Sequence, residues 1–196
     1  KYLSECGSII LINKKHIFYN SNIISKKSKN KTICPVIKAN AYGMGVESIT
    51  KILIEIGHKR FFLANISEGI EIRKKFEDIE IYILNCGHPF NINVLKKYNL
   101  IPVLNNIEDV KIWTNNVLKQ ESCIIHIDTG MNRLGLSYSD VSNIKYTNFL
   151  SKLNIKFIMT HLACAEDKNN KMNEEQLKEF KKCTRIFDQI NKYPIK

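Results

Sequence analysis

The sequence predicts an α/β fold built on a parallel sheet. Short apolar runs of strand length alternate with longer stretches whose apolar residues recur at helical spacing. Counting from Thr32, six strand–helix units follow one another, and strands joined by helices form parallel sheets. The alternation fits both a doubly wound sheet and a (β/α)8 barrel. The sequence contains neither G-x-G-x-x-G nor G-x-x-x-x-G-K-[ST], so nothing in it favours a nucleotide-binding fold.

Each predicted element follows from its local pattern. The strands are apolar runs at Thr32–Lys38, Phe61–Ala64, Ile79–Leu84, Ile101–Leu104, Ser122–Asp128 and Ile155–His161. The amphipathic stretches that follow them predict helices near Glu47–Ile56, Glu68–Phe76, Asn91–Tyr98, Ile107–Leu118, Tyr138–Leu150 and Glu174–Lys192. A further strand is expected at Ser8–Ile12. Asn173 and Gln176 have the spacing of a capping box at the start of the last helix.

The charge of the chain is strongly positive, but its distribution argues against a nucleic-acid-binding surface. The formal net charge is +11, and only four of the 30 basic residues are arginines. Arginine dominates base and phosphate recognition, whereas the lysines here are spread along the chain. A solvated, lysine-rich surface is the simpler interpretation, and an RNA-binding basic protein is the alternative.

The six cysteines and the hydropathy indicate a reduced, cytosolic protein. No two cysteines form a C-x-x-C pair or have zinc-ligand spacing, so we expect free thiols and no metal site. Cys34, Cys86 and Cys123 lie in or beside apolar runs. No apolar run approaches the roughly 18 residues that span a bilayer. The first residues lack the apolar core of a signal peptide, so we expect a soluble chain in the cytoplasm.

Polar residues gather where the predicted strands end, which is where parallel α/β folds place their reactive groups. The first strand ends in Lys38, Asn40 and Tyr42, the fifth in Asp128, Thr129 and Arg133, and the sixth in Thr160 and His161. We therefore expect a lysine, a tyrosine, an arginine and a histidine to converge on one face. Gly43, Gly45 and the Thr129–Gly130 pair are expected to shape turns.

Lys38 is the most distinctive of these residues. It closes the apolar run Cys34–Ile37, so its aliphatic stem is expected in the barrel wall. Desolvation lowers the pKa of a lysine and makes its amine nucleophilic, as Schiff-base chemistry requires. The alternative is an ordinary strand-end lysine whose amine reaches water.

Several segments, in order along the chain, resemble the alanine racemases. Residues 35–45 (PVIKANAYGMG) resemble the family's pyridoxal phosphate (PLP) attachment motif, and residues 64–73 (ANISEGIEIR) its second βα unit. Residues 126–135 (HIDTGMNRLG) and 159–165 (MTHLACA) are similar to its D-T-G-M-x-R-L-G and M-T-H-x-A segments, and residues 173–180 fit the helix that follows. The resemblance implies a TIM (β/α)8-type barrel, incomplete here at about six βα units, with PLP as cofactor.

The resemblance also implies a role for five residues. Lys38 would hold the cofactor as a Schiff base and act as one of two proton-transfer bases. Tyr42 would bind the cofactor phosphate, and Leu84 would pack near the cofactor. Arg133 would lie beside the cofactor's phenolic oxygen and the substrate carboxylate, and His161 by the pyridine ring.

Each of the last four residues also has a purely structural interpretation. Tyr42 could be a loop aromatic and Leu84 a core residue. Arg133 could pair with Asp128, and His161 could be a hydrogen-bonded barrel histidine. The motif context favours function for Lys38, Tyr42 and Arg133, and less strongly for His161 and Leu84.

The chain departs from the family pattern at two points. The family's last two barrel strands and C-terminal β-domain are missing, so we expect a fragment in which residues 14–196 form a partial PLP-binding barrel. Residues 1–13 would then be a strand segment that belongs to the absent domain. His126 stands where many members carry a lysine modified to a carbamate, and neutral imidazole supplies no negative charge.

The function implied is that of an alanine racemase, a PLP-dependent isomerase that interconverts L- and D-alanine and so supplies D-alanine for bacterial peptidoglycan. The full-length protein is expected to be a homodimer, whose partner subunit contributes a tyrosine as the second base. The alternative is a non-catalytic PLP-binding protein or inactive racemase fragment that keeps Lys38 without turnover.

Overall fold

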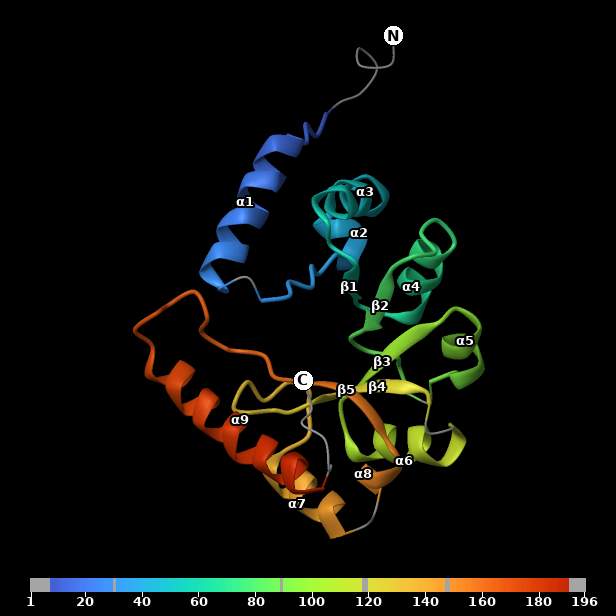
Figure 1. Cartoon of the computed structure of the whole chain (residues 1–196), viewed down its shortest axis with the longest axis vertical. Coiled ribbons are helices and arrows are strands. Elements are labelled where there is room, and N and C mark those ends of the chain that lie inside the picture. Colours follow the sequence, from blue (N-terminus) through green and yellow to red (C-terminus); the bar gives the residue numbers. More distant parts are fainter. Residues whose placement is uncertain (1–7, 30, 89, 118–119, 147–148, 191–196) are drawn as a thin grey trace. The chain divides into compact units, whose positions relative to one another are not determined.

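The computed structural model describes residues 8–29, 31–88, 90–117, 120–146 and 149–190 (Figure 1). The chain divides into two compact units, residues 1–83 and residues 84–196. Both units are made of strands that alternate with helices, as the sequence pattern predicts. The predicted α/β class is therefore seen in each unit.

Unit 1 is built around a pair of parallel strands. Its elements are α1 (Lys14–Lys27), α2 (Lys38–Tyr42), α3 (Val46–Ile56), β1 (Arg60–Leu63), α4 (Ile66–Arg73) and β2 (Glu80–Ile83). β1 and β2 pair in parallel from Arg60↔Glu80 to Leu63↔Ile83. Phe61, Leu63, Ile81 and Ile83 are fully buried, so the core of this unit lies on the strand pair.

Two expectations for the first part of the chain are wrong. The predicted strand Thr32–Lys38 is reduced to one parallel bridge, between Val36 and Phe62 of β1. Ser8–Ile12 is not a strand, and Leu11 within it is 91% exposed. A strand requires a neighbour that shares its backbone hydrogen bonds, and among the described residues no segment pairs with Ser8–Ile12.

Helix α1 was not among the predicted elements. Asn13 caps it by accepting a hydrogen bond from the backbone N–H of Lys15, and α1 contacts α3. Lys14 of α1 also forms an ion pair with Glu55 of α3. No residue of α1 is buried, so the helix lacks the strong apolar stripe that reveals a core helix in a sequence.

Unit 2 is built on three parallel strands. Its elements are α5 (Ile92–Lys97), β3 (Leu100–Leu104), α6 (Ile107–Asn116), β4 (Ser122–His126), α7 (Tyr138–Tyr146), α8 (Phe149–Lys152), β5 (Asn154–Met159) and α9 (Lys171–Ile190). β4 is the middle strand and pairs in parallel with both β3 and β5. Its residues Cys123–His126 are all buried, which explains the apolar run at Cys123–Ile125. Helices α7 and α9 lie side by side (Figure 1).

The predictions for unit 2 hold apart from the ends of elements, and the strands predicted to reach Asp128 and His161 end at His126 and Met159. The single helix predicted at Tyr138–Leu150 is two helices, α7 and α8, and the last two residues of the predicted Glu174–Lys192 helix lie outside the described residues. The predicted capping box is wrong, because α9 begins at Lys171 and Asn173 lies inside it. The Asn173 side chain instead donates to the backbone carbonyls of Cys164 and Asp167.

Candidate active site

Lys38 stands at the start of a left-handed turn. The four residues that follow it, Ala39–Tyr42, have φ values between 52° and 54°, and Gly43 continues the turn with φ 86°. Such a conformation costs an L-residue roughly 1–2 kcal/mol. A strained backbone persists only where its surroundings hold it, and this occurs most often at functional sites.

Two side chains hold this turn. The carboxylate of Glu68, on α4, accepts one hydrogen bond from the N–H of Ala39 at 2.8 Å and another from the N–H of Ala64 at 2.7 Å. The side-chain oxygen of Asn40 accepts from the N–H of Val46 at 2.8 Å. Because Gly45 has no side chain to cap α3, Asn40 satisfies the first turn of that helix from within the left-handed turn.

The turn brings Lys38 and Tyr42 together. The Lys38 amine lies 6.0 Å from the centroid of the Tyr42 ring, and the stem of the lysine is half-buried. Within the described part of the chain, no carboxylate lies within ion-pair distance of this amine. Tyr42 is 60% exposed. The two side chains therefore place a primary amine and a phenolic hydroxyl in the same turn.

In unit 2, the loop that follows β4 carries Arg133. The carboxylate of Asp128 accepts hydrogen bonds from the N–H groups of Gly130, Met131 and Asn132 at 3.0–3.1 Å. Arg133 itself is exposed, and it forms no ion pair with Asp128. Asp128 therefore shapes the loop, and the structural role considered for Arg133 as its partner is not observed.

The same loop returns to the strand through a close backbone approach at Gly135. Leu136 donates to the carbonyl of His126 at 2.8 Å, and Asp128 donates to the carbonyl of Leu136 at 3.0 Å. A Cβ on Gly135 would lie 2.5 Å from the backbone nitrogen of Asp128, and φ here is +119°. Only glycine fits this position, which anchors the loop bearing Arg133.

The loops after β4 and β5 are joined by one amide. Gln176 of α9 is 1% exposed, and its nitrogen donates to the hydroxyl of Thr129 at 3.0 Å and to the carbonyl of His161 at 2.9 Å. Its oxygen accepts from the N–H of Ala163 at 2.9 Å. The hydroxyls of Thr129 and Thr160 lie 2.8 Å apart. The backbone at His161 is thus fixed from α9, while the imidazole of His161 is exposed.

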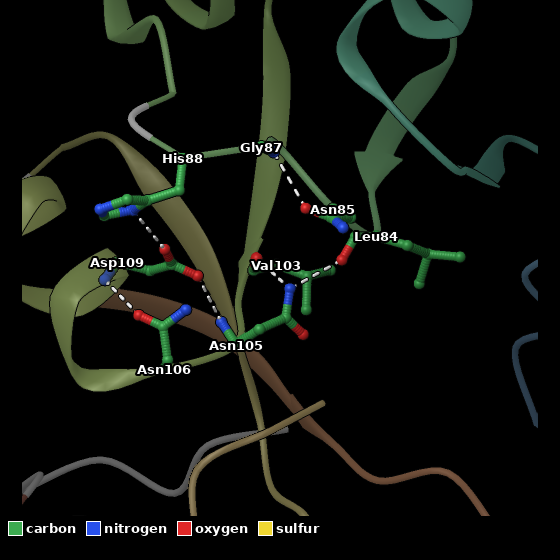
Figure 2. A network of polar contacts seen from close by, with 8 residues as sticks. All are labelled: Leu84, Asn85, Gly87, His88, Val103, Asn105, Asn106 and Asp109. Carbon is green, nitrogen blue, oxygen red and sulfur yellow. Dashed lines mark hydrogen bonds and ion pairs between the residues drawn. The ribbon is translucent and has the colours of Figure 1, made fainter. Parts of the chain in front are cut away.

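A second polar network surrounds Asn105, at the end of β3 (Figure 2). Its amide nitrogen donates to the carbonyls of Leu84 and Val103, and its backbone N–H donates to the carboxylate of Asp109 at 3.0 Å. Its amide oxygen lies 2.8 Å from Nδ1 of His126. Asp109 also lies 3.8 Å from His88. Asn105 therefore connects the ends of β3 and β4 with the residue that follows β2.

His126 is buried at the end of β4, with 8% of its surface exposed. Burial lowers the pKa of its imidazole, the charge of Asp128 raises it, and His161 and Arg133 lower it further. The neutral form of the ring is therefore favoured, and its buried hydrogen bond to Asn105 indicates a structural role at the end of β4.

The predicted site residues fall into two sets. Lys38 and Tyr42 belong to unit 1, whereas Leu84, Arg133 and His161 belong to unit 2. Arg133 follows β4 and His161 follows β5, and these two strands are paired. The backbone carbonyl of Leu84 accepts a hydrogen bond from the side chain of Asn105, which follows β3. The convergence of all five on one site stays a prediction.

Four residues whose side chains form hydrogen bonds to the backbone near the site residues were not predicted as parts of the site. They are Glu68, Asn105, Asp109 and Gln176, and each binds backbone at a strand end or in the loop that follows one. Asn65 and Asn106 each begin a helix directly after a strand end, and a carboxylate follows three residues later. That spacing is the signal that could have revealed Glu68 and Asp109.

The part of the chain that the structure describes contains free cysteines, but neither a cluster of metal ligands nor a membrane-spanning helix. Cys34, Cys86, Cys123, Cys164 and Cys183 are free thiols, and Cys6 lies outside the described residues. Burial raises the pKa of Cys86 to about 12, so this thiol stays protonated beside the Asn105 network. Among the described residues, no three His, Cys, Asp or Glu side chains gather as metal ligands, and no helix is both long and apolar enough to cross a bilayer.

The parallel strands and the residues at their ends define an α/β protein, and comparison with known proteins identifies its family. The family described as "Alanine racemase, N-terminal domain" matches residues 12–196. The alanine racemase of Rickettsia bellii is 40% identical over 165 residues, covering 82% of this chain and 40% of that protein. The alanine racemase of Rickettsia canadensis is 37% identical over 188 residues, covering 92% of this chain and 52% of the relative.

A solved structure supports the same conclusion. The crystal structure of alanine racemase from Bartonella henselae with covalently bound pyridoxal phosphate matches with a TM-score of 0.82 and 29% identity, over 89% of this chain and 52% of that one. The chain belongs to the alanine racemase N-terminal domain family, and the predicted barrel class is confirmed. It spans about half the length, or less, of the relatives it matches.

Replacing Glu68 by glutamine tests whether its carboxylate holds the left-handed turn. One of the two backbone N–H groups, at Ala39 or Ala64, would face a side-chain NH2 instead of an acceptor. Because these groups are not fully buried, loss of one such hydrogen bond is expected to cost about 0.5–1.5 kcal/mol, which urea unfolding measures. Glu71→Gln, at an exposed position of the same helix, is expected to unfold at the wild-type urea concentration. Equal stability of the two variants would contradict this role.

Replacing Gln176 by alanine tests the link between the loops after β4 and β5. The change leaves the N–H of Ala163 and the carbonyl of His161 without their partner, so stability is expected to fall by about 2 kcal/mol or more. Leu177→Ala is the control, because Leu177 is half exposed and its loss is expected to cost about 0.5 kcal/mol or less. Thermal or urea unfolding of both variants distinguishes these outcomes.

Proposed function

We propose that the protein to which this chain belongs is a PLP-dependent alanine racemase that interconverts L- and D-alanine and supplies D-alanine for bacterial peptidoglycan. The observation that carries the proposal is Lys38, a half-buried residue at the start of the left-handed turn beside Tyr42, with no carboxylate of the described residues paired to its amine. Family membership supports the reaction type, and the names of the Rickettsia relatives support the substrate.

The residues present fit PLP. An aldehyde needs a primary amine that is not held in an ion pair, and Lys38 provides one. A phosphate needs hydrogen-bond donors, and the hydroxyl of Tyr42 is accessible in the same turn. A Cβ on Gly43 or Gly45 would meet nothing within 4 Å, so there is open space next to the turn. The Bartonella henselae relative contains covalently bound pyridoxal phosphate.

The assignment of roles follows the chemistry of each side chain. Bound PLP supplies the electron sink that makes the α-hydrogen of an amino acid acidic. Lys38 would hold the cofactor's aldehyde carbon, and its amine, once free, would move the α-proton on one face of the substrate. Tyr42 would donate a hydrogen bond to the phosphate. Arg133 would bind the substrate carboxylate, and Leu84 and His161 would contact the cofactor ring.

Racemisation needs a second base, because a single base returns the proton mostly to the face from which it came. We propose that this base is a tyrosine contributed by a partner subunit, so that the full-length protein acts as a cytoplasmic homodimer. In this proposal residues 14–196 form part of the cofactor-binding barrel, and residues 1–13 belong with a C-terminal domain.

The covalent role of Lys38 is tested by trapping. The full-length protein is incubated with PLP, reduced with borohydride and digested, and the pyridoxyl group is located by mass spectrometry. We expect the label on the peptide containing Lys38, no label in Lys38→Ala, and normal labelling in the control Lys51→Ala, which removes an exposed lysine of α3. A label that persists at another lysine in Lys38→Ala would overturn the cofactor assignment.

The same preparations test the reaction itself. Lys38→Ala is expected to lose at least about 10²-fold in racemisation rate, because it lacks a catalytic base. Rates with alanine, serine and other amino acids define the substrate. A protein that is labelled at Lys38 but racemises none of them would be a PLP carrier, and the proposed activity would be wrong.

Tyr42→Phe tests the phosphate contact. Loss of a hydrogen bond to a charged group costs about 1.5–3 kcal/mol, which corresponds to a roughly tenfold or greater loss of PLP affinity. Tyr19→Phe removes an equally exposed hydroxyl from α1 and is expected to leave the affinity unchanged. Titration of the apoprotein with PLP, followed by fluorescence, measures both, and equal affinities would count against Tyr42.

A further inference from the structure

The backbone is anchored on both sides of Lys38. Before it, the N–H of Ile37 donates to the carbonyl of Phe62, a residue of β1, at 2.9 Å. After it, the N–H of Ala39 donates to the carboxylate of Glu68 at 2.8 Å. The first anchor is an ordinary bond between backbone groups, whereas the second is a side chain that belongs to a different helix.

The reach of Glu68 exceeds what its own helix requires. In a capping box, the acidic side chain at the third helical position accepts from the N–H of the capping residue. Asn65 caps α4, but Glu68 accepts from the N–H of Ala64, the residue before the cap, and from that of Ala39, 29 residues earlier in the chain. The bond to Ala39 adds nothing to the start of α4, so it serves the turn that follows Lys38.

The connection between β3 and α6 shows the local part of this arrangement alone. Asp109 is the third residue of α6 and accepts from the N–H of Asn105, the residue before the cap Asn106, at 3.0 Å. Its other oxygen accepts no backbone N–H among the described residues and lies 3.8 Å from Nδ1 of His88. One oxygen is therefore enough to join a strand end to its helix, and the second oxygen of Glu68 has a separate role.

Packing does not hold the turn on the side of Glu68. A pocket of about 320 Å³ lies there, and Asn40 of the turn and Glu68 line it together with apolar residues such as Ile37, Leu63 and Ile72. Groups that border a pocket lack packing contacts on that side. The hydrogen bond from Ala39 to Glu68, rather than packing, therefore fixes the turn at this point.

We propose that Glu68 is a positioning residue for Lys38, whose carboxylate fixes the start of the left-handed turn relative to β1 so that the amine meets the aldehyde of PLP in a reactive geometry. The inference rests on the proposed function. Because the pocket leaves room for the turn to shift, loss of the carboxylate displaces Lys38 in addition to weakening the fold. An error of about 1 Å in the placement of a reacting group can cost roughly 10²-fold in rate.

A carboxamide cannot take over this role. The N–H groups of Ala39 and Ala64 donate to different oxygens of Glu68. A glutamine side chain has a single oxygen, and its nitrogen only donates. Glu68→Gln therefore keeps the shape of the side chain and loses one of the two bonds.

The rate of labelling at Lys38 tests the proposal in the full-length apoprotein. The protein is mixed with PLP and quenched with borohydride at successive times, and mass spectrometry quantifies the label on the peptide that contains Lys38. Glu68→Gln is expected to label roughly tenfold more slowly or worse. Asp109→Asn makes the same change at the matching position of α6 and is expected to label at the wild-type rate.

The outcomes of this comparison are distinct. A wild-type rate in Glu68→Gln would refute the positioning role, and so would an equal loss of rate in Asp109→Asn. A wild-type protein that carries no label on Lys38 would refute the proposed function on which the inference rests.

Chemical rescue separates the position of Lys38 from the stability of the fold. Glu68→Ala removes the carboxylate and enlarges the pocket that Glu68 lines, which gives a formate ion room to replace it. We expect sodium formate to raise the labelling rate of Glu68→Ala severalfold, whereas formamide at the same concentration and sodium chloride at the same ionic strength do not. Equal rescue by formamide, or none by formate, would contradict the proposal.

Steady-state kinetics provide a further readout. In Glu68→Gln, kcat for alanine is expected to fall roughly tenfold or more while KM changes little, because the amine is displaced and the groups that bind the substrate are not. A higher KM with an unchanged kcat would assign Glu68 to substrate binding and would refute the positioning role.

Discussion

The strand-end loops of this chain depend on side-chain carboxylates that accept backbone N–H groups where a strand stops. Glu68 accepts from Ala64 at the end of β1, and Asp109 accepts from Asn105 at the end of β3, each four residues earlier in the chain. A parallel strand leaves such groups without a ladder partner as soon as its neighbour diverges. Each unsatisfied buried group costs about 1–3 kcal/mol, so a loop that carries reactive side chains needs these acceptors.

The two carboxylates belong to one recurring arrangement. In both βα connections an asparagine begins the helix, and its side-chain oxygen accepts from the N–H of the residue that carries the carboxylate. The helix start and the strand end are thereby fixed by the same short segment. At the first of these connections, the second oxygen of Glu68 extends the arrangement to Ala39 and so to the turn that follows Lys38.

At the end of β5, the side chain that forms hydrogen bonds to the loop comes from a distant part of the sequence. Gln176 lies 15 residues after His161 and 47 residues after Thr129, and it binds both. An amide suits this place because it must donate to a carbonyl and accept from an N–H at once, which a carboxylate cannot do. The exposed imidazole of His161 and the loop bearing Arg133 therefore depend on α9, a helix that contains none of the five predicted site residues.

Much of the architecture could be predicted from sequence, because buried parallel strands are rich in apolar residues, as at Cys123–Ile125. Lys38 could be selected as a candidate site residue from the sequence, since its motif is local, and its role stays a prediction. The role of Gln176 could not be predicted, because its partners come from the folded chain rather than from its neighbours in sequence. The capping-box spacing at Asn173 lies inside a helix, whereas the same spacing at Asn65 and Asn106 marks true helix starts. The predicted strand before Lys38 failed because only Val36 finds a bridge partner.

The left-handed turn after Lys38 has a consequence for the chirality of the residues within it. From Ala39 to Tyr42 the backbone follows the mirror image of an ordinary helical turn, which is the conformation that D-amino acids prefer. Ala39 and Ala41 carry only methyl groups, so their stereochemistry could be inverted by chemical synthesis with little change in volume. A semisynthetic protein with D-alanine at these two positions would release local strain that every ribosomally made copy carries.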